Sequence, residues 1–209
     1  HSDLRKILTA GAVEAVRART RSAECLRARR LAAGGEWKSA LRVLETHDAL
    51  TLPGACRCCA PTAVACLVQL RRAAPLFALA HALVDAYPEH WASWYAVGCY
   101  YYLVGKSELS RRYLCKAKSL EPGAGCVWLA YGHSFVAENE HDLAMAAYFK
   151  ASQLMAGCYL PPLYVGVECS LLNNVASCQK FLLRAALLHS KAEVARYNND
   201  QIFTKWSLR

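Results

Sequence analysis

Four cysteines and a histidine lie close enough in the sequence to suggest a metal site. Cys56, Cys58, Cys59 and Cys66 precede His81, and thiolate and imidazole groups are the ligands that zinc prefers. The spacing lacks the two separated ligand pairs of a zinc motif, and most of the segment falls within a predicted helix. We therefore expect no metal and no cofactor.

A second group of residues could exchange protons. His133, Glu138, Glu140 and His141 carry the imidazole and carboxylate groups that serve as general acids and bases. We expect His133 on a helix and the others in the turn that follows it, so a solvated turn accounts for them. Phosphate-binding glycine loops, hydrolase elbows and paired carboxylates are also missing from the sequence. We therefore expect no catalytic residue and no enzyme.

The composition indicates helices throughout. The chain has 209 residues, of which 55% are apolar, enough for a continuous core. Alanine and leucine are abundant, and the β-branched residues do not alternate, which favours an all-α fold. The longest apolar stretches, 73–84 and 91–105, are too short to cross a bilayer.

The eleven cysteines bear on the redox environment of the chain, and the charge distribution bears on its partners. An odd number of cysteines without regular spacing fits reduced thiols in an intracellular protein. Helix positions that a repeat would bury hold several of them: Cys99, Cys115, Cys126 and Cys178. The net charge of +9 is concentrated at residues 1–30, which hold eight of the 25 Lys and Arg. Such a basic run is usually a solvated flank.

Glycines recur at a period of 34 residues. Gly98, Gly132 and Gly166 share this spacing, as do Trp94 and Trp128. We expect the glycines where two helices cross closely, because a side chain would hold them apart. Other columns of the same repeat are Ala117, Ala151 and Ala185; Leu114, Tyr148 and Leu182; and Leu120, Leu154 and Leu188. A repeat of this length predicts stacked helix pairs, each with a helix A and a helix B.

The turns follow the same period. Gly105, Asn139 and Asn173 occupy the position between helices A and B that favours a left-handed backbone. Just beyond it, Ser107 and Asp142 are expected to cap helix B. Prolines follow two of the B helices, at Pro88 and Pro122.

We expect about five helix pairs, at approximately 23–56, 57–90, 91–124, 125–158 and 159–190. In the first pair, Gly34 and Gly35 form the turn, and helix B carries a stripe of Ala40, Leu41 and Leu44. The register of this pair is displaced by about two residues near Pro53 and Gly54. Residues 1–22 are predicted to be a basic flanking segment or partial helix, and residues 191–209 a tail or capping segment.

The block from Trp94 to Pro122 carries the tetratricopeptide repeat (TPR) pattern. The runs LVDAYP (83–88), SWYAVGCYYYLVG (93–105) and AYGHSFVAENEHDLAMAAYFKASQLM (130–155) go further. They closely resemble the subunit-six family of the anaphase-promoting complex, also called cell division cycle protein sixteen. The close resemblance covers about residues 76–188 and is weaker over 25–75. The family subunit has many more repeats, so we expect a partial or truncated form.

The resemblance implies a TPR solenoid, in which antiparallel helix pairs form a right-handed superhelix. It also implies a non-catalytic scaffold of a cell-cycle ubiquitin ligase that controls mitotic progression, in the nucleus and cytoplasm. Implied partners are other subunits of the complex, a small helical accessory subunit in the groove and, in the full-length family, a second copy. We expect neither a membrane nor a nucleic acid as a partner.

In a TPR stack the binding groove is lined by residues of helix A that lie off the packing stripe. The candidates here are Tyr95, Cys99, Tyr102, Leu129, His133, Val136, Leu163, Val167 and Ser170. They are apolar or aromatic and so do not form the basic carboxylate clamp of chaperone adaptors; an apolar partner segment is expected. The alternative is that they face solvent or the next helix. The residues expected to pack the repeats are Trp94, Gly98, Tyr101, Ala117, Pro122, Trp128, Gly132, Ala151, Gly166 and Ala185.

Two other functions remain open at this stage. One is a TPR adaptor of another multiprotein complex. The other is a basic helical-repeat protein associated with nucleic acid, whose affinity would fall steeply as salt rises.

Overall fold

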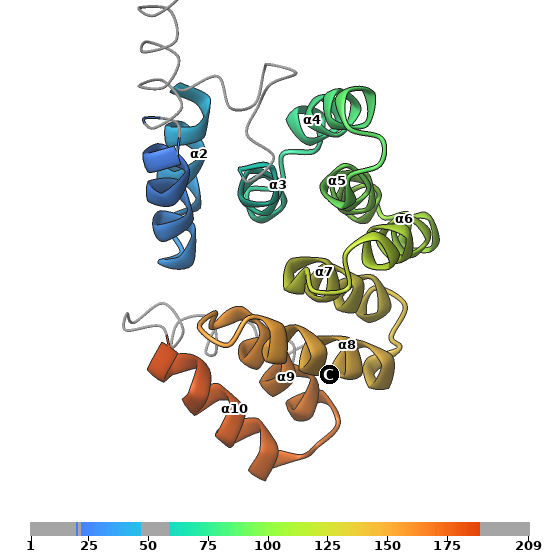
Figure 1. The fold of residues 1–209 in the computed structure, drawn as a ribbon. Coiled ribbons are helices and arrows are strands. Elements are labelled where there is room, and N and C mark those ends of the chain that lie inside the picture. Colours follow the sequence, from blue (N-terminus) through green and yellow to red (C-terminus); the bar gives the residue numbers. More distant parts are fainter. Residues whose placement is uncertain (1–19, 21, 47–58, 189–209) are drawn as a thin grey trace, which may run out of the picture. The chain divides into compact units, whose positions relative to one another are not determined.

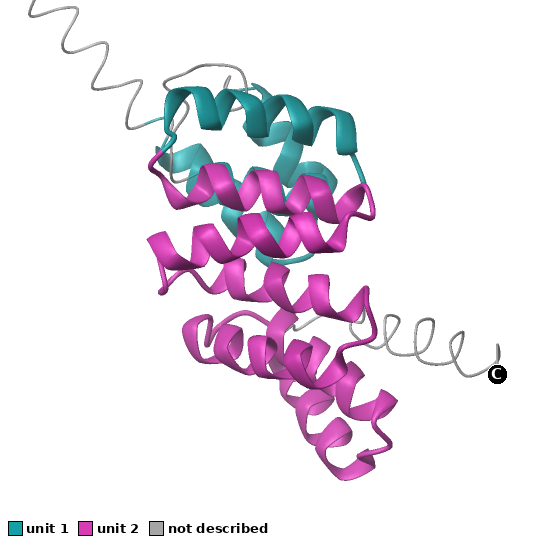
Figure 2. Cartoon of the chain, turned by 90° about the vertical axis from the view of Figure 1, so that its right-hand side faces the viewer, with its two compact units in different colours: residues 1–88 teal, residues 89–209 magenta. Residues whose placement is uncertain are grey.

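The computed structural model describes residues 20, 22–46 and 59–188, which form helices joined by short turns and contain no strand (Figure 1). The all-α prediction is confirmed for this part of the chain. Pro53, Gly54, Cys56 and Cys58 lie outside the described residues, as do the predicted tail 191–209 and nearly all of the predicted flank 1–22. The chain divides into two compact units, residues 1–88 and 89–209 (Figure 2).

Unit 1 contains a helix over residues 22–33, followed by α2 (Trp37–Thr46), α3 (Ala60–Gln69) and α4 (Ala73–Ala86). The predicted stripe on α2 is confirmed, because Ala40, Leu41 and Leu44 are its buried residues. Helix α3 packs against both α2 and α4. Pro88 follows α4 by two residues, as the repeat pattern predicts.

The described residues of unit 2, 89–188, form three helix pairs. They are α5 (Trp91–Leu103) with α6 (Ser107–Leu120), α7 (Gly125–Val136) with α8 (His141–Leu154), and α9 (Leu160–Leu171) with α10 (Val175–Leu188). The two helices of a pair pack on each other, and α6 contacts α7 as α8 contacts α9. Figure 2 shows these helices as successive layers. Contacts between α5 and α7 bring the A helices of neighbouring pairs together.

The repeated glycines lie where helix A meets helix B of its own pair. A Cβ atom at Gly98 would stand 2.6 Å from Cγ of Leu114, and one at Gly166 would stand 2.7 Å from Cδ2 of Leu182. At Gly132 the added atom would overlap the ring of Tyr148. The side chain on helix B thus fills the space that the glycine leaves, which explains why the glycine and Leu or Tyr columns recur together.

The turns between helices A and B share one backbone geometry. The predicted left-handed residues are confirmed: Gly105 has φ 78°, Asn139 62° and Asn173 58°. Gly35 and Arg71 adopt the same conformation, with φ 80° and 52°. After each of these residues, the next backbone N–H donates to the carbonyl five residues earlier, as in a Schellman motif. Arginine was not expected there, because a left-handed backbone is costly for a residue with a long side chain.

The predicted caps of two B helices are wrong. Ser107 is the first residue of α6, whose N-cap is Lys106, and Asp142 is the second residue of α8, whose N-cap is Glu140. Neither N-cap side chain makes a capping hydrogen bond. The Schellman turn leads directly into helix B, so the cap position comes one residue before Ser107 in α6 and two residues before Asp142 in α8.

The expectation of reduced thiols throughout is wrong for one pair. Cys25 and Cys59 form a disulfide with their Cα atoms 5.7 Å apart, and their separation of 34 residues equals the repeat period. Equivalent positions of consecutive repeats lie side by side in a stack, which brings these sulfurs together. Cys115 is also misplaced by the sequence prediction, because it is exposed, whereas Cys99 is buried and Cys126 and Cys178 are half-buried.

Within the described residues, no helix combines the length and the apolar character that spanning a membrane requires.

Candidate partner-binding site

The nine residues proposed for the groove all lie on the A helices of unit 2, which are α5, α7 and α9. Three of them are buried: Tyr95, Cys99 and Leu163 are 4%, 3% and 2% exposed. These three offer little surface to a partner. The other six are half-buried, namely Tyr102, Leu129, His133, Val136, Val167 and Ser170.

Three of the A-helix side chains form a row of rings across the pairs. The rings of Tyr102 on α5 and His133 on α7 stack with their centroids 5.9 Å apart. The rings of His133 and Tyr164 on α9 are then T-shaped, with their centroids 4.4 Å apart and 81° between the ring planes. We call Tyr102, His133 and Tyr164 the aromatic ladder. Rings at these separations attract each other, so the ladder ties three pairs together and presents aromatic groups that remain partly accessible.

Tyr148 on helix α8 packs against two members of the aromatic ladder, His133 and Tyr164. Its side chain is fully buried, its ring stacks on Tyr164 at 5.4 Å, and its hydroxyl oxygen lies 2.6 Å from Nδ1 of His133. The His133 tautomer that carries its proton on Nε2 accepts the hydroxyl hydrogen at Nδ1. This hydrogen bond satisfies the one polar group of an otherwise apolar core position.

Neither Tyr148 nor Tyr164 was predicted as part of the site from the sequence. Tyr148 was grouped with Leu114 and Leu182 as an ordinary packing residue, although a buried tyrosine needs a hydrogen-bond partner that leucine does not. Tyr164 occupies the column in which the two preceding repeats have Ala96 and Ala130. A large ring in an alanine column was the signal that could have revealed it.

Burial lowers the pKa of His133 from 6.5 to about 4, because the surrounding rings do not solvate an imidazolium ion. The folded protein therefore keeps His133 neutral at physiological pH. In the unfolded chain the same group takes up a proton near pH 6.5. The stabilising effect of a neutral His133 is fully present above pH 6.5 and is lost progressively as the pH falls towards 4.

We expect the stability of the protein to decrease between pH 6.5 and 4, and part of this decrease to disappear in the variant His133→Gln. Glutamine can accept the Tyr148 hydroxyl but does not titrate, so the difference between the two proteins isolates His133. Urea denaturation followed by circular dichroism at several pH values measures it. Parallel profiles for His133→Gln and the wild type would contradict the assignment.

The suspected acid–base group is not assembled in the structure. Nδ1 of His141 lies 2.7 Å from Oε2 of the buried Glu168 on α9, while Glu138 pairs with Arg111 on α6. His133 contacts Tyr148 instead. The His141–Glu168 contact and the Arg111–Glu138 ion pair each join one helix pair to the next. These side chains therefore connect successive helix pairs of the stack.

The residues expected to pack the repeats occupy several environments. Ala117, Ala151 and Ala185 are fully buried. The half-buried rings of Trp94 and Tyr101 lie on either side of Tyr113, at 5.9 and 5.4 Å. Pro122 is itself exposed, but its carbonyl accepts a hydrogen bond of 2.9 Å from Nε1 of Trp128.

The described part of the chain contains no cluster of three or more His, Cys, Asp or Glu side chains that could hold a metal ion. Two of the four cysteines considered for zinc, Cys56 and Cys58, lie outside it. Of the other two, Cys59 is in the disulfide, and burial raises the pKa of Cys66 to about 12, which keeps this thiol protonated.

The paired helices, the recurring glycines and the Schellman turns define a tetratricopeptide-repeat protein. Solved structures agree: the chain superimposes on TTC0263, a TPR protein of Thermus thermophilus, with a TM-score of 0.66 over 85% of this chain and 96% of that one, at 16% identity. It also superimposes on the APC/C hetero-tetramer Cut9–Hcn1 with a TM-score of 0.71 and 30% identity, over 78% of this chain and 30% of that one.

Sequence comparisons identify the branch of this class. The chain is 48% identical over 160 residues to the human cell division cycle protein 16 homolog, covering 72% of this chain and 26% of the relative. It is 38% identical over 107 residues to the anaphase-promoting complex subunit cut9 of Schizosaccharomyces pombe, covering 51% of this chain and 16% of the relative. A scan against protein-family profiles gives no match. The chain belongs to the subunit-six family of the anaphase-promoting complex, and it spans about a quarter of the human relative's length.

Proposed function

We propose that this chain is a non-catalytic TPR scaffold segment that binds other subunits of the anaphase-promoting complex and thereby serves mitotic progression. The observation that carries the proposal is the identity of 48% over 160 residues to a member of that complex. We further propose that the chain acts in the nucleus and cytoplasm, and that its repeats correspond to the five predicted helix pairs.

The aromatic ladder is the surface we propose for this binding. Tyr102, His133 and Tyr164 lie on consecutive A helices and are half-buried, so a partner could cover them at little cost in side-chain entropy. Aromatic side chains of this kind supply much of the binding energy at protein interfaces. The half-buried Leu129 and Val136 on α7 extend the apolar character of this face. A partner with an apolar helix or extended segment suits it best.

The solved Cut9–Hcn1 complex shows that a relative of this chain assembles with a second protein. By analogy, we propose that a small accessory subunit of the Hcn1 type binds along the A helices of unit 2. Dimerisation, which the resemblance implies for the full-length family, is a further proposal.

We expect purified Hcn1 to bind the chain, and the variant Tyr102→Ala to weaken this binding about tenfold or more. A large aromatic side chain at the centre of an interface commonly contributes about 2 kcal/mol or more, and 1.4 kcal/mol corresponds to a factor of ten. Isothermal titration calorimetry measures the change. The matched control is Tyr100→Ala, a half-buried tyrosine on the same helix that is not part of the ladder.

A second measurement tests the assignment to the complex itself. Affinity capture from cell extract followed by mass spectrometry should recover other subunits of the anaphase-promoting complex. Recovery of a different complex instead would favour the alternative TPR adaptor. Equal losses of Hcn1 binding in Tyr102→Ala and Tyr100→Ala would remove the ladder from the proposal without touching the family assignment.

A further inference from the structure

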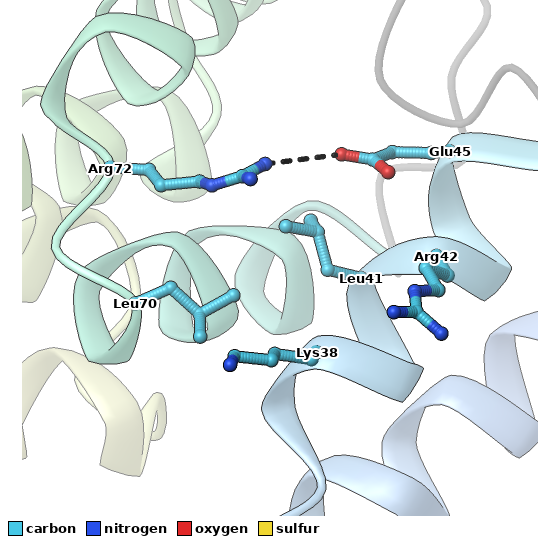
Figure 3. Close-up of a pocket in the computed structure, with 6 residues that line it drawn as sticks. All are labelled: Lys38, Leu41, Arg42, Glu45, Leu70 and Arg72. Atoms are coloured by element: carbon cyan, nitrogen blue, oxygen red, sulfur yellow. Dashed lines mark ion pairs between the residues drawn. The ribbon is translucent and has the colours of Figure 1, made fainter.

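Unit 1 contains a pocket whose rim is mostly cationic. Helix α2 contributes Lys38, Leu41, Arg42 and Glu45 to its wall, and the turn between α3 and α4 contributes Leu70 and Arg72. Figure 3 shows Arg72 and Glu45 reaching towards each other above the pocket, with Leu41 and Leu70 between the charged groups. Three positive charges thus face one negative charge around an aliphatic floor.

The positive charges are poorly compensated. Nη1 of Arg72 is 3.9 Å from Oε1 of Glu45, and both side chains are about half exposed, so their ion pair is weak. Within the described residues, no carboxylate lies within ion-pairing distance of Lys38 or Arg42. These two residues are also four apart on one helix face, where like charges repel.

The turn next to the pocket departs from the repeat pattern, because it has an arginine where the other turns have glycine or asparagine. Arg71 has φ 52°, in the left-handed region, whereas the equivalent turns use Gly35, Gly105, Asn139 and Asn173. Arginine is disfavoured in this conformation, and its side chain is exposed, so it gains no burial in return. Strain of this kind often marks a functional position. Arg71 itself does not line the pocket, but it lies in the chain between the lining residues Leu70 and Arg72.

We propose that this basic pocket binds an acidic peptide segment in which carboxylates flank an aliphatic side chain. The carboxylates would pair with Lys38, Arg42 and Arg72, the last of which can form two parallel hydrogen bonds to one carboxylate. The aliphatic side chain would lie against Leu41 and Leu70. The pocket shares no residue with the aromatic ladder, so the inference goes beyond the proposed function.

The pocket suits a peptide better than a nucleic acid. None of its lining residues is aromatic, whereas sites for single-stranded nucleic acid commonly stack bases on aromatic rings. Glu45 adds a negative charge that repels a continuous phosphate backbone. Separate carboxylates of a peptide can instead pair with the cationic residues without lying next to Glu45. An incoming carboxylate competes with Glu45 for Arg72, and the weak existing ion pair makes this exchange easy.

The test uses the full chain and a fluorescein-labelled peptide of the sequence Asp-Glu-Leu-Asp-Glu, with binding measured by fluorescence anisotropy. We expect the double variant Lys38→Glu/Arg42→Glu to weaken binding at least tenfold. The control Arg112→Glu/Lys150→Glu changes the net charge equally at exposed positions of unit 2 and should leave the affinity within a factor of two. Circular dichroism establishes that each variant is folded.

Arg71→Gly gives an independent readout. Relief of the left-handed strain should raise the thermal midpoint, while loss of the cation should weaken peptide binding several-fold. A raised midpoint with unchanged affinity would remove Arg71 from the site. The proposal as a whole is overturned if the peptide does not bind, if the control pair loses as much affinity as the pocket pair, or if a single-stranded oligonucleotide binds the pocket more tightly than the peptide. Hcn1 binding to Lys38→Glu/Arg42→Glu should equal that of the wild type, which keeps this test separate from the ladder.

Discussion

Replacement of Tyr148 by alanine is expected to lower the free energy of unfolding by about 3–5 kcal/mol, as truncation of a buried aromatic side chain commonly does. The Tyr148 side chain is fully buried on α8, stacks on Tyr164 and bonds to His133. It also occupies the space left by the missing side chain of Gly132. Its removal would therefore open a cavity bordered by α7 and α9.

The variant Tyr148→Phe separates the ring from the hydroxyl. It keeps the packing and removes only the hydrogen bond to Nδ1 of His133, so we expect a loss of about 1 kcal/mol. Urea denaturation followed by circular dichroism measures both variants. A phenylalanine variant as unstable as the alanine variant would show that the hydrogen bond, and not the packing, makes the position important.

Leu114→Ala is the second large effect, with an expected loss of about 2–5 kcal/mol. Leu114 on α6 is fully buried, and it occupies the same column as Tyr148 one repeat earlier. The control is Leu120→Ala near the end of the same helix, where the side chain is 42% exposed. We expect that control to change the stability by less than about 1 kcal/mol, because little apolar surface is lost from the core.

A second substitution, Gly98→Ala, tests whether Leu114 fills the space beside this glycine. A Cβ atom at residue 98 would stand 2.6 Å from Cγ of Leu114, so Gly98→Ala should destabilise the wild type by about 1–2 kcal/mol through overpacking. In the Leu114→Ala background the leucine Cγ and Cδ2 atoms no longer meet the added atom, and only the backbone N of residue 114 remains near it, at 3.2 Å. Alanine also stabilises a helix by about 1 kcal/mol relative to glycine. There the same substitution should be stabilising.

The change in the free energy of unfolding caused by Gly98→Ala should thus have opposite signs in the two backgrounds. This expectation does not depend on the exact size of either single effect. Residues in contact show coupling energies of about 0.5–3 kcal/mol in such double-mutant cycles. Urea denaturation of the four proteins measures the coupling. If Gly98→Ala has the same effect in both backgrounds, the glycine and leucine columns do not depend on each other.

These variants also test the solenoid character of unit 2. Tyr148 and Leu114 occupy equivalent columns in adjacent helix pairs, and in a repeat stack each pair contacts only its neighbours. Their effects should therefore resemble each other in kind and differ mainly by the size of the cavity. The His141–Glu168 and Arg111–Glu138 pairs connect the successive layers.

The sequence predicted the repeated features because each depends on local chemistry. Gly105, Asn139 and Asn173 tolerate a left-handed backbone whatever surrounds them. Similarly, the glycine column and the Leu or Tyr column share one period, so their contact follows from the stack alone. The stripe on α2 was predictable for the same reason, since apolar residues at helical spacing face the core.

Other features depend on side chains that come together from different repeats, and the sequence did not predict them. The aromatic ladder joins positions from three different columns, 102, 133 and 164, because consecutive A helices lie beside one another with an offset. The basic pocket likewise needs α2 and the α3–α4 turn to meet. The burial of Tyr95, Cys99 and Leu163 was also not predictable from the sequence. The repeat pattern distinguishes the faces of a helix, but it does not indicate how deeply each residue is buried.

The sequence by itself thus determined the helix pairs, their period and their turns, because these follow from backbone propensity and from positions that recur every 34 residues. The family was indicated separately, by the resemblance of particular runs such as 93–105 and 130–155. Only the tertiary structure decided which side chains meet: Tyr148 with His133, Cys25 with Cys59, and Arg72 with Glu45. The reason is physical. A period specifies which residues are equivalent, whereas contacts between repeats depend on the offset and separation of neighbouring helices, which the packing of all their side chains sets together.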